Sequence, residues 1–397
     1  MSHQLISRSP DLKRLQNEGY DLEIRSGFLL TKGIPYVNAR REVCRGTLVV
    51  KLVLAGDVTT RPDDHVAYFA GEHPCRADGT EIAETKHGSG ERELAEGVVV
   101  QHSFSAKPKP GDFYSDYYAK VTTYAAMFSG PAQLLDPEAR PQVFRIVQPG
   151  EEVSETPFRY IDTASSRAEI DIITAKLKKF KKVAIVGLGG TGSYVLDLVA
   201  KTPVPEIHLY DGDAYLQHNA FRSPGAPSVE ELAGKVPKVT WFKTLYTKMH
   251  AGIVEHAVYV DEQNIAQLRD MSFVFLCIDS GEAKRVIVQK LEQFDVPFID
   301  VGMGVQVSNE ALGGIVRVTT STPEKRDHFR QRVSLADGAG NNEYDRNIQV
   351  ADLNALNAAL AVIKWKKLAG FYRDMKAEHH SQFTIDGNLL INEDQPQ

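Results

Sequence analysis

Two short apolar runs near the middle of the chain set the pattern from which its fold is predicted. Residues 183–186 form a β-branched run that meets a glycine-rich turn, and apolar residues then recur at helical spacing between 194 and 199. A second apolar run, 207–210, follows. Buried strands that alternate with an amphipathic helix are typical of parallel α/β sheets. The pattern therefore predicts two neighbouring parallel strands joined by a crossover helix.

The glycine turn and the acid that ends the second run predict a nucleotide site. Glycines let backbone N–H groups approach phosphate at a helix N-terminus, and an acid at the tip of the next strand bonds ribose hydroxyls. Asp211 lies at that tip, and Asp213 follows in the same loop. A tight turn that binds nothing is the alternative. The candidate nucleotide-binding glycines are Gly187, Gly189, Gly190 and Gly192.

The charged residues that follow favour a triphosphate over a nicotinamide cofactor. Asn219, Arg222 and Lys238 come soon after the ribose acid, and arginine and lysine side chains hold phosphate oxygens. Asp279 ends a further apolar run, 273–278, at the sheet edge where open α/β folds bind ligands. It is therefore placed to hold Mg²⁺. Alternatively, the two cations are solvated loop charges and Asp279 caps the helix that follows.

Five short motifs now form an ordered set. They are GLGGTG, DGD, HNAFR, GKVPK and CIDS. Together they resemble the ThiF/MoeB-type adenylating enzymes, the bacterial relatives of ubiquitin-activating enzymes. The resemblance covers about residues 165–397, including the segments 296–302 and 351–360. It implies a Rossmann-like α/β adenylation domain with a mostly parallel sheet.

The resemblance also implies a reaction, in which ATP and the C-terminal glycine of a ubiquitin-like protein give an acyl-adenylate and pyrophosphate. By position in the motifs, Asp211 binds the ribose and Asp279 coordinates Mg²⁺. The residues implied to contact the phosphates are Asn219, Arg222 and Lys238. Such a site fits the chemistry because a carboxylate nucleophile needs no general base, so that alignment and charge stabilisation on the phosphates suffice.

A homodimer is a further implication of the resemblance. Family members place an arginine just upstream of the first strand, often reaching into the partner subunit's site, and Arg167 is the best match. The other expected partners are the ubiquitin-like protein and a downstream conjugating enzyme. The unfamiliar N-terminal region favours a conjugation pathway, with a link to phage defence as one hypothesis, over activation of a sulfur carrier or of another carboxylate.

The cysteines depart from the family pattern. Cys44, Cys75 and Cys277 are the only three, with no CxxC pair, so a zinc tetrathiolate is excluded. The loop 319–347, where thioester-forming relatives carry a reactive cysteine, has none. The apolar run around Cys277 predicts that this residue is a small buried hydrophobic residue of a strand. The adenylate is then handed directly to an acceptor, or an oxygen nucleophile such as Ser334 forms an ester.

The first part of the chain reads as a separate α+β domain. The turn-rich stretch 148–165 predicts a boundary, which gives an N-terminal domain at 1–155 and the adenylation domain at 160–397, led by a helix at 167–181. The N-terminal domain resembles an uncharacterised domain found ahead of ThiF-type domains in bacteria, and we expect it to dock the substrate or a partner. Its predicted helices are 10–19 and 114–128, and its predicted strands are 21–30, 46–55, 65–70 and 97–104.

Two clusters in this domain have alternative interpretations. Cys75 beside His73 is either a reactive thiol or a half-buried structural residue. The histidines and Cys75 match no standard zinc spacing, which favours scattered surface or core histidines. The aromatic residues of the helix 114–128 favour a core or interface face over a ligand box.

Composition narrows the classes of protein that remain. Hydrophobic residues make up 42% and charged residues 25% of the 397, and the net charge of −6 argues against a nucleic-acid binder. With no long apolar run, no membrane span is expected, and the few cysteines favour a reducing cytoplasm. Two rivals remain: an NAD-dependent oxidoreductase, which would leave the downstream charges unused, and an inactive nucleotide-binding scaffold.

Overall fold

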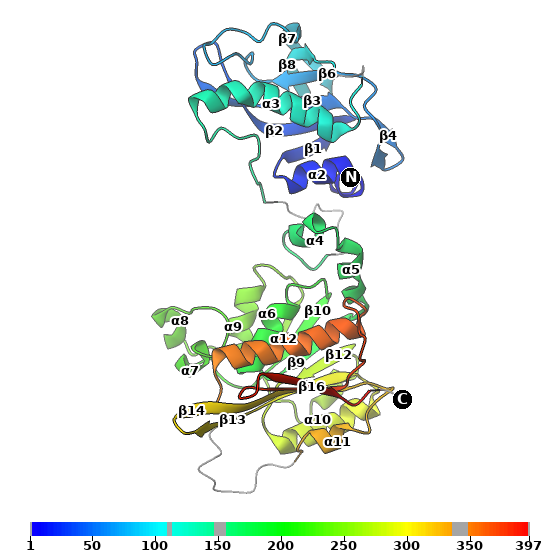
Figure 1. The fold of residues 1–397 in the computed structure, drawn as a ribbon, viewed down its shortest axis with the longest axis vertical. Coiled ribbons are helices and arrows are strands. Elements are labelled where there is room, and N and C mark those ends of the chain that lie inside the picture. The colour runs from blue at the N-terminus through cyan, green and yellow to red at the C-terminus, as the bar shows by residue number, and fades with distance from the viewer. Residues whose placement is uncertain (1, 109–112, 147–155, 336–347, 396–397) are drawn as a thin grey trace. The chain divides into compact units, whose positions relative to one another are not determined.

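The computed structural model describes residues 2–108, 113–146, 156–335 and 348–395. The chain forms two compact units (Figure 1), one made of Met1–Ser154 with Tyr160–Ala168 and the other of Glu155–Arg159 with Glu169–Gln397. Within the described ranges, none of the helices has the length and apolar character that a membrane span requires.

The N-terminal unit is built on a six-stranded antiparallel sheet with the order β1-β2-β3-β6-β8-β7. Helix α3 packs across β2 and β3 (Figure 1), and the short strands β4 and β5 pair with each other. The bounds are α1 (Ser2–Arg8), α2 (Pro10–Asn17), β1 (Asp21–Arg25), β2 (Phe28–Val37), β3 (Val43–Lys51), β4 (Leu54–Ala55), β5 (Val58–Thr59), β6 (Val66–Ala70), β7 (Lys86–Ala95), β8 (Val98–Ser105) and α3 (Tyr117–Leu135).

Two local expectations for this unit were wrong, and one strand was not predicted. The strand expected at 21–30 is a hairpin, because Ser26 and Gly27 adopt positive φ and turn the chain between β1 and β2. The aromatic helix starts later, where the Asp116 carboxylate accepts from the Ala119 N–H at 2.7 Å, and it runs on to Leu135. Strand β7 has the mostly polar sequence KHGSGERELA. It lacks the alternation of apolar and polar residues by which a strand is recognised in a sequence.

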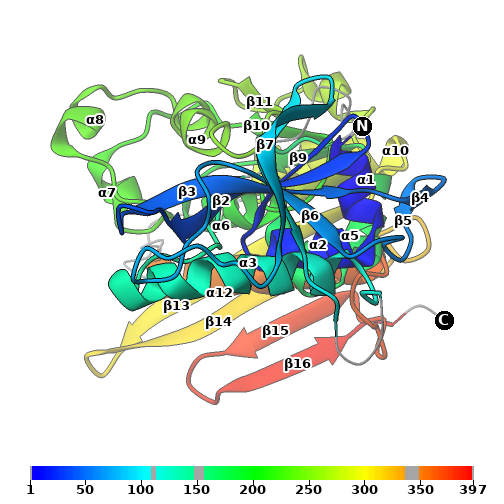
Figure 2. The same cartoon turned by 90° about the horizontal axis from the view of Figure 1, so that it is seen from above.

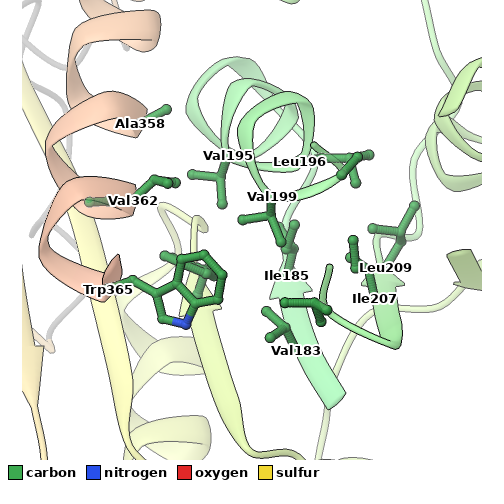
Figure 3. Close-up of a cluster of buried hydrophobic side chains, with 14 of the residues drawn as sticks. Val183, Ile185, Val195, Leu196, Val199, Ile207, Leu209, Ala358, Val362 and Trp365 are labelled. Carbon is green, nitrogen blue, oxygen red and sulfur yellow. The ribbon is translucent and has the colours of Figure 1, made fainter. Parts of the chain in front are cut away.

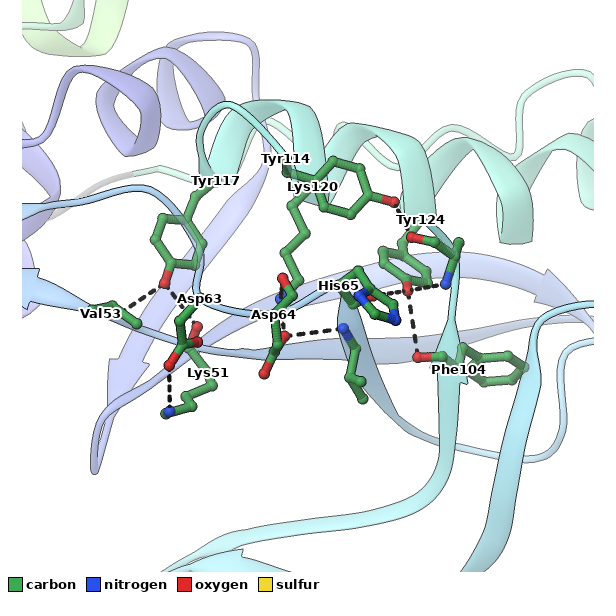
Figure 4. A network of polar contacts seen from close by, with 12 residues as sticks. Lys51, Val53, Asp63, Asp64, His65, Phe104, Tyr114, Tyr117, Lys120 and Tyr124 are labelled. Carbon is green, nitrogen blue, oxygen red and sulfur yellow. Dashed lines mark hydrogen bonds and ion pairs between the residues drawn. The ribbon is translucent and has the colours of Figure 1, made fainter. Parts of the chain in front are cut away.

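Tyr117, Tyr124 and Phe128 of α3 are fully buried, and the hydroxyl groups of the two tyrosines form hydrogen bonds (Figure 4). Tyr117 donates a hydrogen bond to the Lys51 carbonyl oxygen at 2.9 Å. Lys120 has no exposed side-chain surface and forms an ion pair with Asp64 at 2.7 Å, while burial lowers the pKa of the Lys120 ammonium. These contacts support the core interpretation of the aromatic helix over a ligand box.

The C-terminal unit is a three-layer α/β fold on an eight-stranded sheet with the order β11-β10-β9-β12-β13-β14-β15-β16. The strands from β11 to β13 are parallel, and β13 to β16 are antiparallel hairpins that extend side by side in Figure 2. The strand bounds are β9 (Lys182–Val186), β10 (Glu206–Tyr210), β11 (Ile253–His256), β12 (Phe273–Leu276), β13 (Phe298–Ser308), β14 (Ala311–Ser321), β15 (His380–Thr384) and β16 (Leu389–Glu393).

Helices cover both faces of the parallel strands, which explains their continuous apolar runs. Val183 and Ile185 of β9 face a cluster that includes Val195 and Trp365 (Figure 3), whereas Val186 faces the helix α10 on the other side. The helix bounds are α6 (Gly190–Val199), α7 (Gln217–Ala220), α8 (Val229–Ala233), α9 (Lys238–Tyr246), η2 (Ile265–Leu268), α10 (Gly281–Gln293), α11 (Phe329–Arg332) and α12 (Ala351–Leu368). The expected fold class, a Rossmann-like domain preceded by a separate α+β domain, is confirmed.

The single helix expected at 167–181 was wrong. The chain instead forms α4 (Thr163–Arg167), α5 (Asp171–Ala175) and a 3-10 turn η1 (Lys176–Lys179). Glu169 has a φ of 57°, a left-handed conformation that ends α4 before α5 begins. The loop expected at 319–347 is also shorter, because β14 runs to Ser321 and α11 follows; residues 336–347 lie outside the described ranges.

Candidate functional site

A cavity of about 780 Å³ lies beyond the carboxyl ends of β9, β10 and β12, beside β13. This is the edge at which open parallel sheets bind ligands. Eight of the residues expected at the nucleotide site line it, namely Gly187, Gly189, Gly190, Asp211, Asp213, Arg222, Lys238 and Asp279. Gly192, Asn219 and Arg167 do not.

A Cβ atom would meet different surroundings at each of the four glycines of the turn. Gly187 has a φ of 89°, and a Cβ there would lie 2.6 Å from the Cys277 carbonyl oxygen. Gly190 packs against Asn354 of α12, where a Cβ would lie 2.1 Å from Nδ2, and a Cβ on Gly192 would lie 1.9 Å from the Gly187 oxygen. A Cβ on Gly189 would meet no atom within 4 Å. Gly189 therefore opens directly into the cavity at the start of α6.

The two acids after β10 hold the turn and a lysine. Asp211 is buried, and its carboxylate accepts from the N–H groups of Leu188 at 2.7 Å and Asp213 at 2.9 Å. Lys238 Nζ lies 2.6 Å from Asp213 and 3.5 Å from Asp211. The hydrogen bond from Lys238, together with one from Tyr259, holds the pKa of the Asp213 carboxyl below its usual range.

Arg222 reaches the cavity, but Asn219 does not. The Asn219 side chain turns back and accepts from the Leu216 N–H at 2.9 Å, which fixes the first turn of α7. This bond helps to hold the loop that carries Arg222, and the Asn219 Nδ2 is buried with no hydrogen-bond partner among the described residues. Arg222 Nε is buried and has no hydrogen-bond partner among the described residues, so its donor capacity is available to a ligand.

Asp279 is not the cap of α10. Ser280 is the N-cap residue, and its hydroxyl accepts from the Ala283 N–H at 3.4 Å. Asp279 lies one residue earlier, at the end of β12, and lines the cavity. Ser280 rather than Asp279 is therefore the N-cap residue of α10.

A buried charge cluster on the β13 side of the cavity was missed from the sequence. Asp300 is fully buried and pairs with Lys284 at 2.7 Å and with Arg317 at 2.8 Å. Lys284 and Arg317 also line the cavity. The signal was present, because an aspartate within the apolar run 296–301 requires cationic partners if the strand is buried.

Three further side chains with reactive or titratable groups line the cavity, namely Cys277, Ser334 and His380. Cys277 lies just after β12, is partly exposed and lines the cavity, which corrects its expected place inside the strand. Desolvation and the Asp300 carboxylate raise the pKa of the Cys277 thiol. Ser334 is exposed and lines the cavity. His380 also lines it; burial and the nearby Arg332 lower the pKa of the His380 imidazole to about 4.

Two candidates lie in the N-terminal unit. Arg167 is exposed on α4 and lines a separate cavity of that unit. Cys75 is buried, its thiol donates to the His73 carbonyl oxygen at 3.3 Å, and burial raises the pKa of that thiol. This favours the structural interpretation of Cys75. Within the described residues no group of three or more histidine, cysteine or acidic side chains could hold a metal ion.

The fold and the cavity define a Rossmann-like nucleotide-binding domain. A ThiF family model matches residues 166–363, so that this part of the chain belongs to the ThiF family and the resemblance is confirmed. Residues 10–163 match a domain of unknown function, DUF6791. None of the curated proteins matches the chain.

Among solved structures, E. coli MccB with MccA-N7isoASN is 18% identical, with a TM-score of 0.47, and the match covers 57% of this chain and 67% of MccB. E. coli MccB with AMPCPP and MccA is also 18% identical, with a TM-score of 0.46 and coverage of 71% and 83%. PaaA is 17% identical, with a TM-score of 0.44 and coverage of 58% and 80%.

Proposed function

We propose that the chain is an ATP-dependent adenylyltransferase that activates the C-terminal glycine carboxylate of a ubiquitin-like protein. The observation that carries this proposal is a single cavity in a ThiF-family domain that joins an open glycine turn to Asp211, Arg222, Lys238 and Asp279. A nicotinamide site would use the turn and the ribose acid only. The two cations and the second acid suit a triphosphate.

The ATP would lie with its ribose at Asp211 and its phosphates over Gly189 at the N-terminus of α6. Arg222 supports this placement because its buried Nε has no partner among the described residues. Lys238 has three donors, and the bonds to Asp213 and Asp211 leave one of them for a phosphate oxygen.

In the reaction, a carboxylate oxygen of the substrate attacks the α-phosphorus of ATP. A new bond forms between that oxygen and phosphorus, the bond from the α-phosphorus to the bridging oxygen breaks, and pyrophosphate leaves with the electron pair. No proton needs to move from the nucleophile. Arg222 and Lys238 stabilise the charge that develops on the phosphates, and the rigid turn aligns them.

Mg²⁺ fits this site through Asp279. A hard cation of this kind is held by one or two carboxylates together with substrate phosphates, and Asp279 brings one carboxylate to the cavity wall. When bound, the ion neutralises charge on the phosphates. The Lys284 ammonium, five residues further along α10, lies in the same wall.

After activation, we propose transfer of the acyl group without a cysteine of this domain. The raised pKa of Cys277 keeps its thiol protonated at neutral pH. The adenylate then passes directly to an acceptor, or Ser334 forms an ester. A hydroxylamine-sensitive adduct that still forms on a Ser334→Ala variant would exclude Ser334.

Two parts of the proposal concern partners. The N-terminal unit, at about 1–155, docks the ubiquitin-like protein or a conjugating enzyme, and the adenylation domain at 160–397 works as a homodimer in which Arg167 reaches the partner subunit's site. A bacterial conjugation pathway, including one in phage defence, is the setting that we favour.

The test is ATP–pyrophosphate exchange with Mg²⁺ and a ubiquitin-like protein that ends in glycine. We expect exchange that requires the terminal glycine and is lost in Asp279→Ala, while Asp270→Ala, a control outside the cavity lining, retains it. ATP binding without exchange would indicate an inactive scaffold or another carboxylate. Binding of reduced nicotinamide without ATP binding would refute the proposal.

A further inference from the structure

Asn357 is a buried polar side chain in the cavity wall that the chemistry above does not use. It lies on α12, is fully buried, and lines the cavity together with Gly302 of β13. Its Nδ2 donates a hydrogen bond to the Gly302 carbonyl oxygen at 3.0 Å, which assigns the two ends of the amide. Oδ1 has no hydrogen-bond partner among the described residues.

The unpaired acceptor, Asn357 Oδ1, indicates that a ligand donates a hydrogen bond at this position. Leaving a buried acceptor unpaired costs about 1–3 kcal/mol, and buried polar atoms of folded proteins nearly always have partners. Asn354, one turn earlier on α12, provides the contrast. Its Oδ1 accepts from the Thr191 hydroxyl at 2.9 Å, and its Nδ2 donates to the Arg222 carbonyl oxygen at 3.4 Å. Of these two asparagines only Asn357 has an acceptor left over.

The strand beside Asn357 leaves room for a peptide backbone. β12 pairs with β13 only over Phe298, Ile299 and Asp300, whereas β14 pairs with β13 along its whole length. Beyond Asp300, no described strand occupies the β12 side of β13, and there residues 302–304 line the cavity. A Cβ on Gly304 would meet only Ile315, at 3.7 Å. An open strand edge of this kind accommodates an extended peptide.

We propose that Asn357 Oδ1 accepts a hydrogen bond from the last peptide N–H of the acyl substrate. The inference rests on the proposed function and deepens it, because it names a second group of the substrate that the site recognises, the last peptide N–H beside the carboxylate. The substrate is a peptide C-terminus that lies extended along β13, with its carboxylate toward the ATP site. A C-terminal proline, which lacks the N–H, and a hydroxy acid or fatty acid are rejected.

Two mimics of the acyl-adenylate that differ in one atom test this inference. One is 5′-O-(N-acetylglycylsulfamoyl)adenosine, and the other carries an acetoxyacetyl group, in which an ester oxygen replaces the N–H. Calorimetry on the full chain measures both affinities. We expect the wild type to bind the amide mimic about tenfold more tightly, the gain of one hydrogen bond, and Asn357→Leu to bind the two equally.

Asn354→Leu is the matched control, because it alters the same helix at an asparagine whose acceptor is already satisfied. It weakens both mimics and keeps the preference for the amide. Equal binding by the wild type, or a preference that persists in Asn357→Leu, overturns the inference alone. Binding of ATP without binding of either mimic overturns the adenylation proposal as well. If Asn357→Leu does not fold, Asn357→Ala replaces it and the wild-type ratio still decides.

Discussion

Alanine substitutions at two adjacent glycines of the turn, Gly189 and Gly190, test phosphate binding and helix packing separately. A methyl group on Gly189 enters the cavity without meeting another atom within 4 Å. The φ of −72° and ψ of −146° of this residue lie outside the main allowed regions for a residue with a Cβ, so that an alanine here strains the backbone. A methyl group on Gly190 lies 2.1 Å from Asn354 Nδ2. Gly189→Ala should therefore obstruct the ligand and strain only its own backbone, whereas Gly190→Ala should strain the contact between α6 and α12.

The magnitudes follow from these contacts. Overpacking of a well-filled core costs about 1–3 kcal/mol, so that Gly190→Ala should lower Tm by roughly 2–10 °C in a unit of this size. Gly189→Ala should cost about 1–3 kcal/mol through backbone strain. Because the backbone must approach the phosphates closely, it should weaken ATP binding at least about tenfold, or about 1.4 kcal/mol.

Thermal unfolding without nucleotide, and calorimetric titration with ATP and Mg²⁺, measure the two effects on the same preparations. The wild type is the reference, and the two variants add the same single methyl group at neighbouring positions. If Gly189→Ala binds ATP as tightly as the wild type, the turn does not cradle phosphate and the cavity is not the nucleotide site. If Gly190→Ala unfolds like the wild type, the packing argument fails.

Three further predictions concern charge and thiols. Asp300→Asn should cost about 3–5 kcal/mol of stability, because breaking a buried ion pair leaves a charge uncompensated; denaturant unfolding that matches the wild type would contradict this. The pKa of His380 is about 4 when folded and about 6.5 when unfolded, so that stability should fall as the pH drops from 6.5 to 4, and Tm should fall less steeply in His380→Gln. Cys75, which is buried and has a raised thiol pKa, should react with a thiol reagent at pH 8 more slowly than the partly exposed Cys44, and modification of Cys75 first would refute this.

The candidate site was predictable where chemistry and sequence order coincide. The glycine turn, Asp211 and Asp279 each follow an apolar run, and the carboxyl ends of parallel strands meet at one edge of the sheet. Asn219 lies between them in the same motif, yet its side chain folds back onto Leu216. Side-chain direction within a short loop depends on local hydrogen bonds that the motif alone does not specify.

The sequence by itself determined the ThiF-family domain, its nucleotide turn and the separate N-terminal domain, because periodicity, glycine and turn residues are local signals. The cluster of Lys284, Asp300 and Arg317 was decided only by the tertiary structure. So was the unpaired acceptor of Asn357 beside Gly302. These groups come from α10, β13, β14 and α12, and packing brings them together across long stretches of sequence. Whether a buried polar atom has a partner depends on that packing, so no local pattern in the chain could reveal it.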